Sequence, residues 1–184
     1  LGLANLGALY DDREYPDQAL VYLDQALHLA ELTGEELQRA NITMNMGVAY
    51  RLKGDLVTAE RLIWQAEAIF RRLYNAIGLA QVQDNLGLVC IDLGRLPEAK
   101  AHLKAAEQAW HKLGNKYGAI RTLTYLLEYE LARKSQPQAS RYLARIERLI
   151  ALAGKEGQAP HWQDLLTKCC RSLAAYMAHP AAAD

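Results

Sequence analysis

Apolar residues recur along this chain with a period of 40 residues. Dividing the sequence after residues 40, 80 and 120 gives blocks that align without a gap. Large apolar residues hold the sixth and twenty-third positions of every block: Leu6, Met46, Leu86 and Leu126, then Leu23, Ile63, Leu103 and Leu143. A fixed period of this length is typical of repeat proteins, in which each repeat is one supersecondary unit that packs against its neighbours.

Small residues recur in the same register. Glycine holds the seventh position of the first three blocks, and alanine holds the nineteenth and twenty-sixth: Gly7, Gly47 and Gly87; Ala19, Ala59, Ala99 and Ala139; Ala26, Ala66 and Ala106. Two antiparallel helices approach closely only where a small residue lies at their crossing. Each block therefore predicts a first helix that carries the glycine, a turn, and a second helix that carries the alanines.

Glycine and proline mark the expected helix ends. Glycine adopts the left-handed conformation that closes a helix, and it occurs where helices should end: Gly34, Gly54, Gly94, Gly114 and Gly154. Proline suits the first helical turn, where its missing N–H is not needed, and it opens second helices at Pro16, Pro97 and Pro137. The pattern predicts helices over residues 2–13, 17–33, 37–53, 56–73, 77–93, 97–113, 117–133 and 137–153.

The tenth position completes the series with Tyr10, Tyr50 and then Cys90. Together with the glycine and alanine positions, it makes the sequence resemble the tetratricopeptide repeat (TPR) family, in a longer variant. The resemblance covers residues 1–160 as four TPR-like repeats, 1–40, 41–80, 81–120 and 121–160, and it implies an all-α, right-handed α-solenoid. HEAT and armadillo repeats have similar periods but do not require this Gly, Tyr, Ala and Ala series, so they remain a distant alternative.

The fourth block departs from the pattern. Leu127 replaces the glycine, Glu130 the tyrosine and Ile146 the second alanine, which predicts a terminal repeat whose helices cross at a wider spacing. Residues 161–184 are expected to form a C-terminal capping helix and tail, with one apolar face at helical spacing: Trp162, Leu165, Leu166, Cys169, Leu173, Tyr176 and Met177. The first block has no comparable cap, so upstream repeats or self-association are expected at the N-terminal face.

Composition narrows the function classes. Of the 184 residues, 51% are hydrophobic and 23% are charged, which suits a folded domain. The 21 basic residues balance the 21 acidic ones, and the lack of a cationic excess disfavours direct binding to nucleic acid. No apolar run approaches the ~20 residues that span a bilayer. The three cysteines are an odd number and do not suggest a set of paired disulfide bonds, which favours a reducing compartment. We therefore expect a cytoplasmic protein.

Residues that could carry chemistry do not combine into a site. The five histidines make no pair with a carboxylate or cysteine at metal-ligand spacing, so neither a metal nor a cofactor is predicted. Cys90 stands at a core position, which favours a buried structural thiol. Nothing in the sequence lowers a cysteine pKa as a nucleophile requires, and the adjacent Cys169 and Cys170 are a weaker alternative as a redox pair. An enzyme is therefore disfavoured.

The resemblance implies that first helices line a concave groove and that the fifth block position faces into it. That position holds Asn5, Asn45, Asn85 and Tyr125. An Asn amide both donates and accepts hydrogen bonds, so this ladder could pair with the backbone of an extended peptide. Adjacent helices pack ~10 Å apart, and an extended peptide rises ~3.3 Å per residue. The Asn residues of successive blocks would therefore meet about every third residue of the peptide. Alternatively, this Asn is simply common in repeats of such length.

Neighbouring positions predict a mixed surface. The first block position holds Asn41, Gln81 and Arg121; Arg121 could hold an acidic group or be a solvated helix start. The family's carboxylate clamp requires Lys at the fourth position, where this chain has Ala4, Met44, Asp84 and Thr124. Clamp function is therefore disfavoured.

Two function classes remain open. The first is a non-enzymatic scaffold that binds a protein or an extended peptide in the concave groove. The alternative is a sensor or regulatory section of a larger bacterial-type signalling ATPase or transcriptional activator. An upstream nucleotide-binding loop or helix-turn-helix would favour the alternative.

Overall fold

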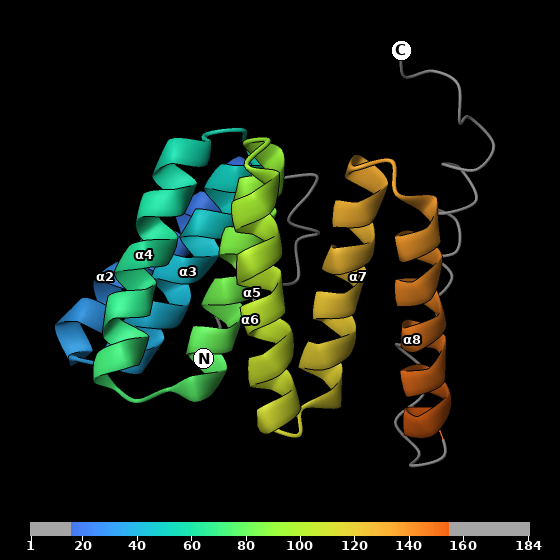
Figure 1. Cartoon of the computed structure of the whole chain (residues 1–184). Helices are drawn as coiled ribbons and strands as arrows, with labels where there is room; N and C mark the ends of the chain where they lie inside the picture. Colours follow the sequence, from blue (N-terminus) through green and yellow to red (C-terminus); the bar gives the residue numbers. More distant parts are fainter. Residues whose placement is uncertain (1–15, 155–184) are drawn as a thin grey trace. The chain divides into compact units, whose positions relative to one another are not determined.

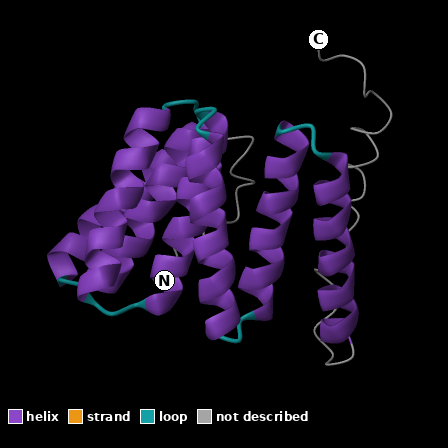
Figure 2. Ribbon diagram, in the orientation of Figure 1, coloured by secondary structure: helices purple, strands orange, loops and turns teal. Residues whose placement is uncertain are grey.

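The computed structural model of this protein describes residues 16–154, and helices joined by short turns account for them (Figure 1). Among these residues there is no strand (Figure 2). The helices are α2 (Pro16–Thr33), α3 (Glu36–Leu52), α4 (Leu56–Arg72), α5 (Ala76–Asp92), α6 (Leu96–Lys112), α7 (Lys116–Ala132) and α8 (Gln136–Gly154). Every bound agrees with the expected ranges to within one residue, so the all-α repeat fold is confirmed. The predicted helix 2–13 and the capping helix within 161–184 lie outside the described residues.

Left-handed residues end the helices at regular intervals of 20 residues. The glycines expected there have φ angles from 63° to 84°: Gly34, Gly54, Gly94 and Gly114. Tyr74 and Lys134 take the same conformation, with φ angles of 52° and 58°. The next residue closes each turn; Asn75, for example, donates its backbone N–H to the Phe70 carbonyl at 2.9 Å. The sequence did not predict this conformation at Tyr74 and Lys134, because neither residue carries a glycine signal.

Side-chain caps begin three of the helices. Asn75 accepts a hydrogen bond from the Gly78 backbone N–H at 2.7 Å, and Asn115 accepts the equivalent bond from Gly118 at 2.9 Å. Asp55 does the same for the Thr58 N–H at 3.1 Å. Such caps satisfy N–H groups that have no partner inside the helix. They set the first residue of α4, α5 and α7.

The described residues fall into two compact units, divided between Arg95 and Leu96. The first unit contains α2 to α5, and the second contains α6 to α8. In the first unit, α3 packs on α2 and α4, and α5 packs on α4 and contacts α3. In the second unit, α7 packs on both α6 and α8. The division falls between the two helices of the third block, where the 40-residue pattern continues without a break.

The crossing of α3 and α4 depends on small residues, as the sequence predicted. Gly47 lies so close to α4 that a Cβ on it would come within 2.8 Å of Ile63 Cγ1 and 3.1 Å of the Ala59 carbonyl oxygen. Ala59, Ile63 and Ala66 are fully buried at this interface. Because no side chain separates the backbones here, the two helices pack at close range.

A second kind of close contact joins α4 to α5 and α6 to α7. A Cβ on Gly78 would overlap the ring of Phe70, and a Cβ on Gly118 would overlap the indole of Trp110. Both rings are almost fully buried. Packing of a ring on a bare helix backbone therefore recurs after 40 residues, in α4–α5 and in α6–α7.

Different side chains, two of them larger, fill the equivalent interior of the fourth block. Leu127, Glu130 and Ile146 are all buried in the second unit, at positions that are Gly, Tyr and Ala in earlier blocks. The substitutions therefore do occupy the interior, while the wider helix spacing that we expect from them stays a prediction.

The close α3–α4 crossing can be tested at Ala59. Ala59→Leu should lower the free energy of unfolding by about 1–3 kcal/mol, because the added side chain overpacks the crossing. Urea denaturation measures the change. Ala68→Leu makes the same change on an exposed position of α4 and should have little effect. An unchanged midpoint for Ala59→Leu would show that the repeat register is wrong.

Tyr74 offers a test of the left-handed turns. Its side chain is 92% exposed, so little packing is lost when it is removed. Tyr74→Gly should raise the free energy of unfolding by about 0.5–1 kcal/mol, because relief of left-handed strain outweighs the added chain entropy of glycine. Tyr117→Gly, at an exposed helical position, should be destabilising. A loss of stability in both variants would contradict the assignment.

Candidate functional site

Amide side chains from two consecutive blocks form a face of the first unit. Asn41 and Asn45 lie on α3, and Gln81 and Asn85 lie on α5; all four are half-buried. A spacing of four residues puts each pair on one side of its helix. Because α3 and α5 contact each other and are equivalent helices of successive blocks, the four amides extend from matching positions. We call these four residues the amide face.

The remaining predicted site residues are not part of the amide face. Asn5 lies outside the described residues. Arg121 and Tyr125 are half-buried on α7 of the second unit. The Arg121 guanidinium carbon lies 5.5 Å from the centre of the Trp110 ring and 5.9 Å from that of Tyr117. Arg121 therefore lies against two aromatic rings, and its predicted role of holding an acidic group stays a prediction.

An ion pair joins α3 to α5. Arg51 Nη1 lies 2.8 Å from Asp92 Oδ2, and the Arg51 side chain is only 18% exposed. Asp92 follows Asn85 by seven residues, which is two helical turns, so it lies on the same side of α5 as the amides. A surface ion pair of this kind adds little stability, but it restrains the two helices that carry the amide face. The sequence analysis did not predict this pair.

The fourth block position is buried in every block that the structure describes. Met44, Asp84 and Thr124 are 5%, 1% and 6% exposed. The Thr124 hydroxyl donates to the Ile120 carbonyl within the same helix. The position that a carboxylate clamp would need thus carries no lysine and does not lie at the surface. Clamp function therefore stays disfavoured.

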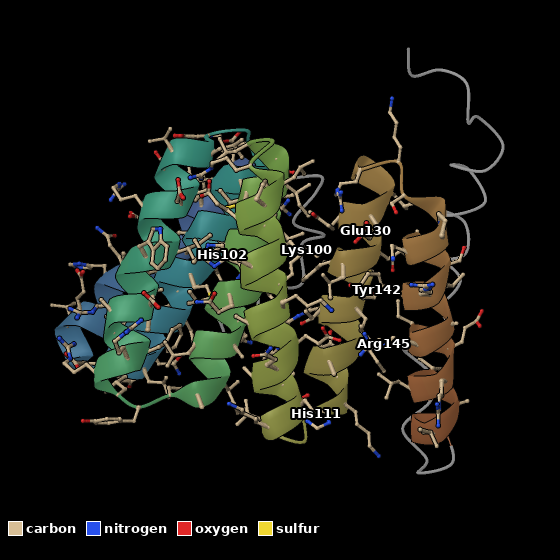
Figure 3. All side chains as sticks on the ribbon, viewed as in Figure 1. Lys100, His102, His111, Glu130, Tyr142 and Arg145 are labelled. Atoms are coloured by element: carbon tan, nitrogen blue, oxygen red, sulfur yellow. The ribbon has the colours of Figure 1, made fainter. Side chains whose placement is uncertain are left out.

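A charged cluster links α6 to α8 in the second unit. Lys104 Nζ lies 2.7 Å from one oxygen of Glu107, and Arg145 Nη2 lies 2.6 Å from the other. Burial raises the pKa of Glu107, but the hydrogen bonds from Lys104 and Arg145 outweigh it, so the net pKa is below the usual value of 4.5. Lys104 also lies over the Tyr142 ring, at 5.2 Å from its centre. Tyr142 and Arg145 follow one another along α8 in Figure 3.

The described residues offer little other chemistry. They contain no group of three or more His, Cys, Asp or Glu residues that could hold a metal ion. Cys90 is buried on α5, as the sequence predicted, whereas Cys169 and Cys170 lie outside the residues described. In the same part of the chain, no helix is both long and apolar enough to cross a bilayer.

The Glu107 cluster predicts a pH-dependent stability. Because the folded pKa of Glu107 is lowered, its contribution is complete above the unfolded value near 4.5 and is lost as the pH falls through the folded pKa. Glu107→Gln should lower the free energy of unfolding by about 1 kcal/mol at pH 7, since the partners are partly exposed and screened. This deficit should shrink as the pH falls.

Urea denaturation of both proteins from pH 7 to pH 3 measures the difference. Glu147→Gln, which changes an exposed residue of α8, is the matched control and should have little effect at pH 7. A deficit of Glu107→Gln that stays constant down to pH 3 would contradict the assignment.

Comparisons with known proteins support the fold. No protein-family model and no curated protein matches this sequence. A crystal structure described as Podosopora anserina putative kinesin light chain nearly identical TPR-like repeats has 16% identity and a TM-score of 0.62 over 98% of this chain and 96% of its own. A variant of that protein has 17% identity and a TM-score of 0.61 over 95% and 94%. At this identity the similarity shows the fold alone: this chain has the TPR-like repeat fold.

Proposed function

We propose that this chain is a non-enzymatic scaffold that binds an extended segment of a partner protein along the amide face. The TPR-like repeat fold suggests an interaction scaffold in general terms. The observation that carries the specific proposal is the placement of Asn45 and Asn85 at equivalent positions of two contacting helices. A repeated polar group on a repeated scaffold matches a ligand that is itself periodic.

The chemistry of the amide face suits a peptide backbone. Each amide can donate and accept at once, as a peptide unit does. Asn45 and Asn85 are half-buried, so their positions are restrained and less conformational entropy is lost when a ligand binds. The four amide side chains of the face carry no charge, and the ion pair between α3 and α5 joins Arg51 to Asp92. Recognition would therefore rest on the peptide backbone more than on charged side chains.

Other predictions concern residues and properties of the protein outside the amide face. Arg121 and Tyr125 remain predicted contacts of the second unit, with Arg121 as the group suited to an acidic residue. The regulatory alternative stays a hypothesis about the whole protein, and a nucleotide-binding loop or helix-turn-helix encoded beside this chain would favour it. The cytoplasmic location and a signalling role stay predictions as well.

The amide face can be tested with a peptide selected from a random displayed library. Replacing both Asn45 and Asn85 with Ala should weaken binding of that peptide by about 2 kcal/mol, at ~1 kcal/mol for each lost hydrogen-bonding group. Calorimetric titration measures the affinity. The melting temperature should stay nearly unchanged, because both side chains are partly exposed.

A matched control uses Gln25 and Gln65, which are also 40 residues apart but are exposed on α2 and α4. Their double replacement by Ala should leave the affinity unchanged. The proposal fails if no peptide is selected, or if the selected peptide binds the Asn45 and Asn85 variant as tightly as the parent protein.

A further inference from the structure

Exposed apolar side chains gather at one end of the first unit, where α2 passes into α3 and α4 passes into α5 (Figure 1). An ion pair of 2.6 Å between Arg72 and Glu36 joins the end of α4 to the start of α3, so the two turns lie side by side. We call the exposed apolar residues of these turns the turn patch: Leu32, Leu37, Leu73, Tyr74 and Ile77. Apolar side chains that gather on a surface mark interaction sites, unlike those that are scattered singly.

Tyr74 is the most exposed residue of the turn patch, and its backbone conformation disfavours it. The side chain is 92% exposed and the φ angle is 52°. Glycine holds the equivalent position of four other described turns, at Gly34, Gly54, Gly94 and Gly114. A left-handed conformation costs a tyrosine stability, and packing within the same copy recovers little of it. Strained residues cluster at functional sites, and tyrosine is enriched among the residues that carry binding energy at interfaces. Tyr74 therefore suits an anchor for a partner.

Charges of opposite sign lie beside the two turns. Glu31 and Glu35, at the α2–α3 turn, are exposed and make no ion pair with a described residue. Arg71 and Arg72, at the end of α4, each make one ion pair within the unit, yet their side chains stay 72% and 57% exposed. A guanidinium has five N–H donors, so each arginine can contact a second carboxylate.

This distribution of charge fits a second copy of the chain. In a two-fold symmetric pair, both copies use the same patch. The arrangement that places each turn opposite the other turn of the partner copy brings carboxylates to arginines twice, with the apolar side chains between them. A partner surface of one charge sign would leave one of the two turns unmatched. A bilayer matches less well, because its anionic headgroups repel the exposed carboxylates.

We propose that the turn patch is a self-association surface, through which two copies of this chain form a two-fold symmetric dimer. Tyr74 of each copy packs among the apolar side chains of the other. The patch adjoins the amide face, because Leu37 precedes Asn41 by four residues on α3. The same spacing separates Ile77 from Gln81 on α5. No residue belongs to both surfaces, so the dimer does not rest on the function proposed above.

Analytical ultracentrifugation of the full 184-residue chain over a concentration series tests the dimer. The parent protein should shift from the monomer mass to the dimer mass as its concentration rises. Tyr74→Gly should raise the dimer dissociation constant by about tenfold or more, because the anchor is lost twice in a two-fold interface. The same change should stabilise the chain when unfolding is compared at a concentration at which the parent is monomeric, so unfolding would not account for weaker association.

Tyr117→Gly is the matched control for the loss of an exposed tyrosine. It lies on α7 of the second unit and should destabilise the chain while leaving the dimer dissociation constant unchanged. The two variants should therefore change stability and association in different ways. Circular dichroism checks that both are folded.

A second variant tests the pairing of charges. Glu31→Lys should raise the dimer dissociation constant by about threefold or more, because it places like charges opposite each other twice. Lysine suits the last turn of a helix, so α2 should stay intact. Glu147→Lys makes the same change of charge at an exposed residue of α8 and should have no effect on association.

The proposal is overturned if the parent chain sediments as a monomer at every concentration. It is also overturned if Tyr74→Gly associates as tightly as the parent, since the copies would then meet through another surface. Loss of affinity in Tyr74→Gly without any loss in Glu31→Lys would overturn the two-fold arrangement that places each turn opposite the other.

Discussion

Close approach of helix backbones at small residues underlies the rest of this structure. A Cβ on Gly47 would meet Ile63 and the Ala59 carbonyl, and the ring of Phe70 occupies the space where Gly78 has no side chain. At such distances the interface tolerates little change in volume, because protein interiors are close-packed. These contacts repeat along the chain. Within each unit, such contacts therefore fix the distances between the helices that they join and keep those distances regular.

The amide face depends on this regularity. Asn45 and Asn85 are useful to an extended ligand only if α3 and α5 hold a constant separation and rotation. The Gly47 crossing joins α3 to α4, and the ring of Phe70 joins α4 to α5. The ion pair between Arg51 and Asp92 then restrains α3 against α5 directly. Packing thus positions the polar groups, and the polar groups contribute little to holding the helices together.

The second unit contains the same kind of contact between an aromatic ring and a glycine. Trp110 packs on Gly118 as Phe70 packs on Gly78, but the larger indole also lines a cleft of about 600 Å³ between α6, α7 and α8. Glu107 and Arg145 join α6 to α8 across that region. In the first block the ring and the glycine are both absent, since Ala30 and Gln38 hold their positions. In that block, the small Ala30 holds the position of the ring and the larger Gln38 holds the position of the glycine.

The helices, their order and the register of their small residues can be read from the sequence alone. These features are local or strictly periodic, so the positions of Ala59 and Gly54 are readable without a structure. The sequence also placed Asn45 and Asn85 at equivalent positions. Contacts between side chains of different helices become visible only in the folded chain. The pairing of Glu107 with Arg145 and the cleft formed by three helices have no signal in the spacing of residues.

The turn at Tyr74 shows the same distinction. Its left-handed backbone is imposed by the helices on either side, which must end and begin at the interval that the repeats require. The residue itself disfavours that conformation, so local sequence could not reveal it. Likewise, the division between Arg95 and Leu96 falls inside an unbroken repeat pattern. Periodicity specifies which residues are equivalent, whereas the strength of packing around each equivalent position is set by the particular side chains that meet there.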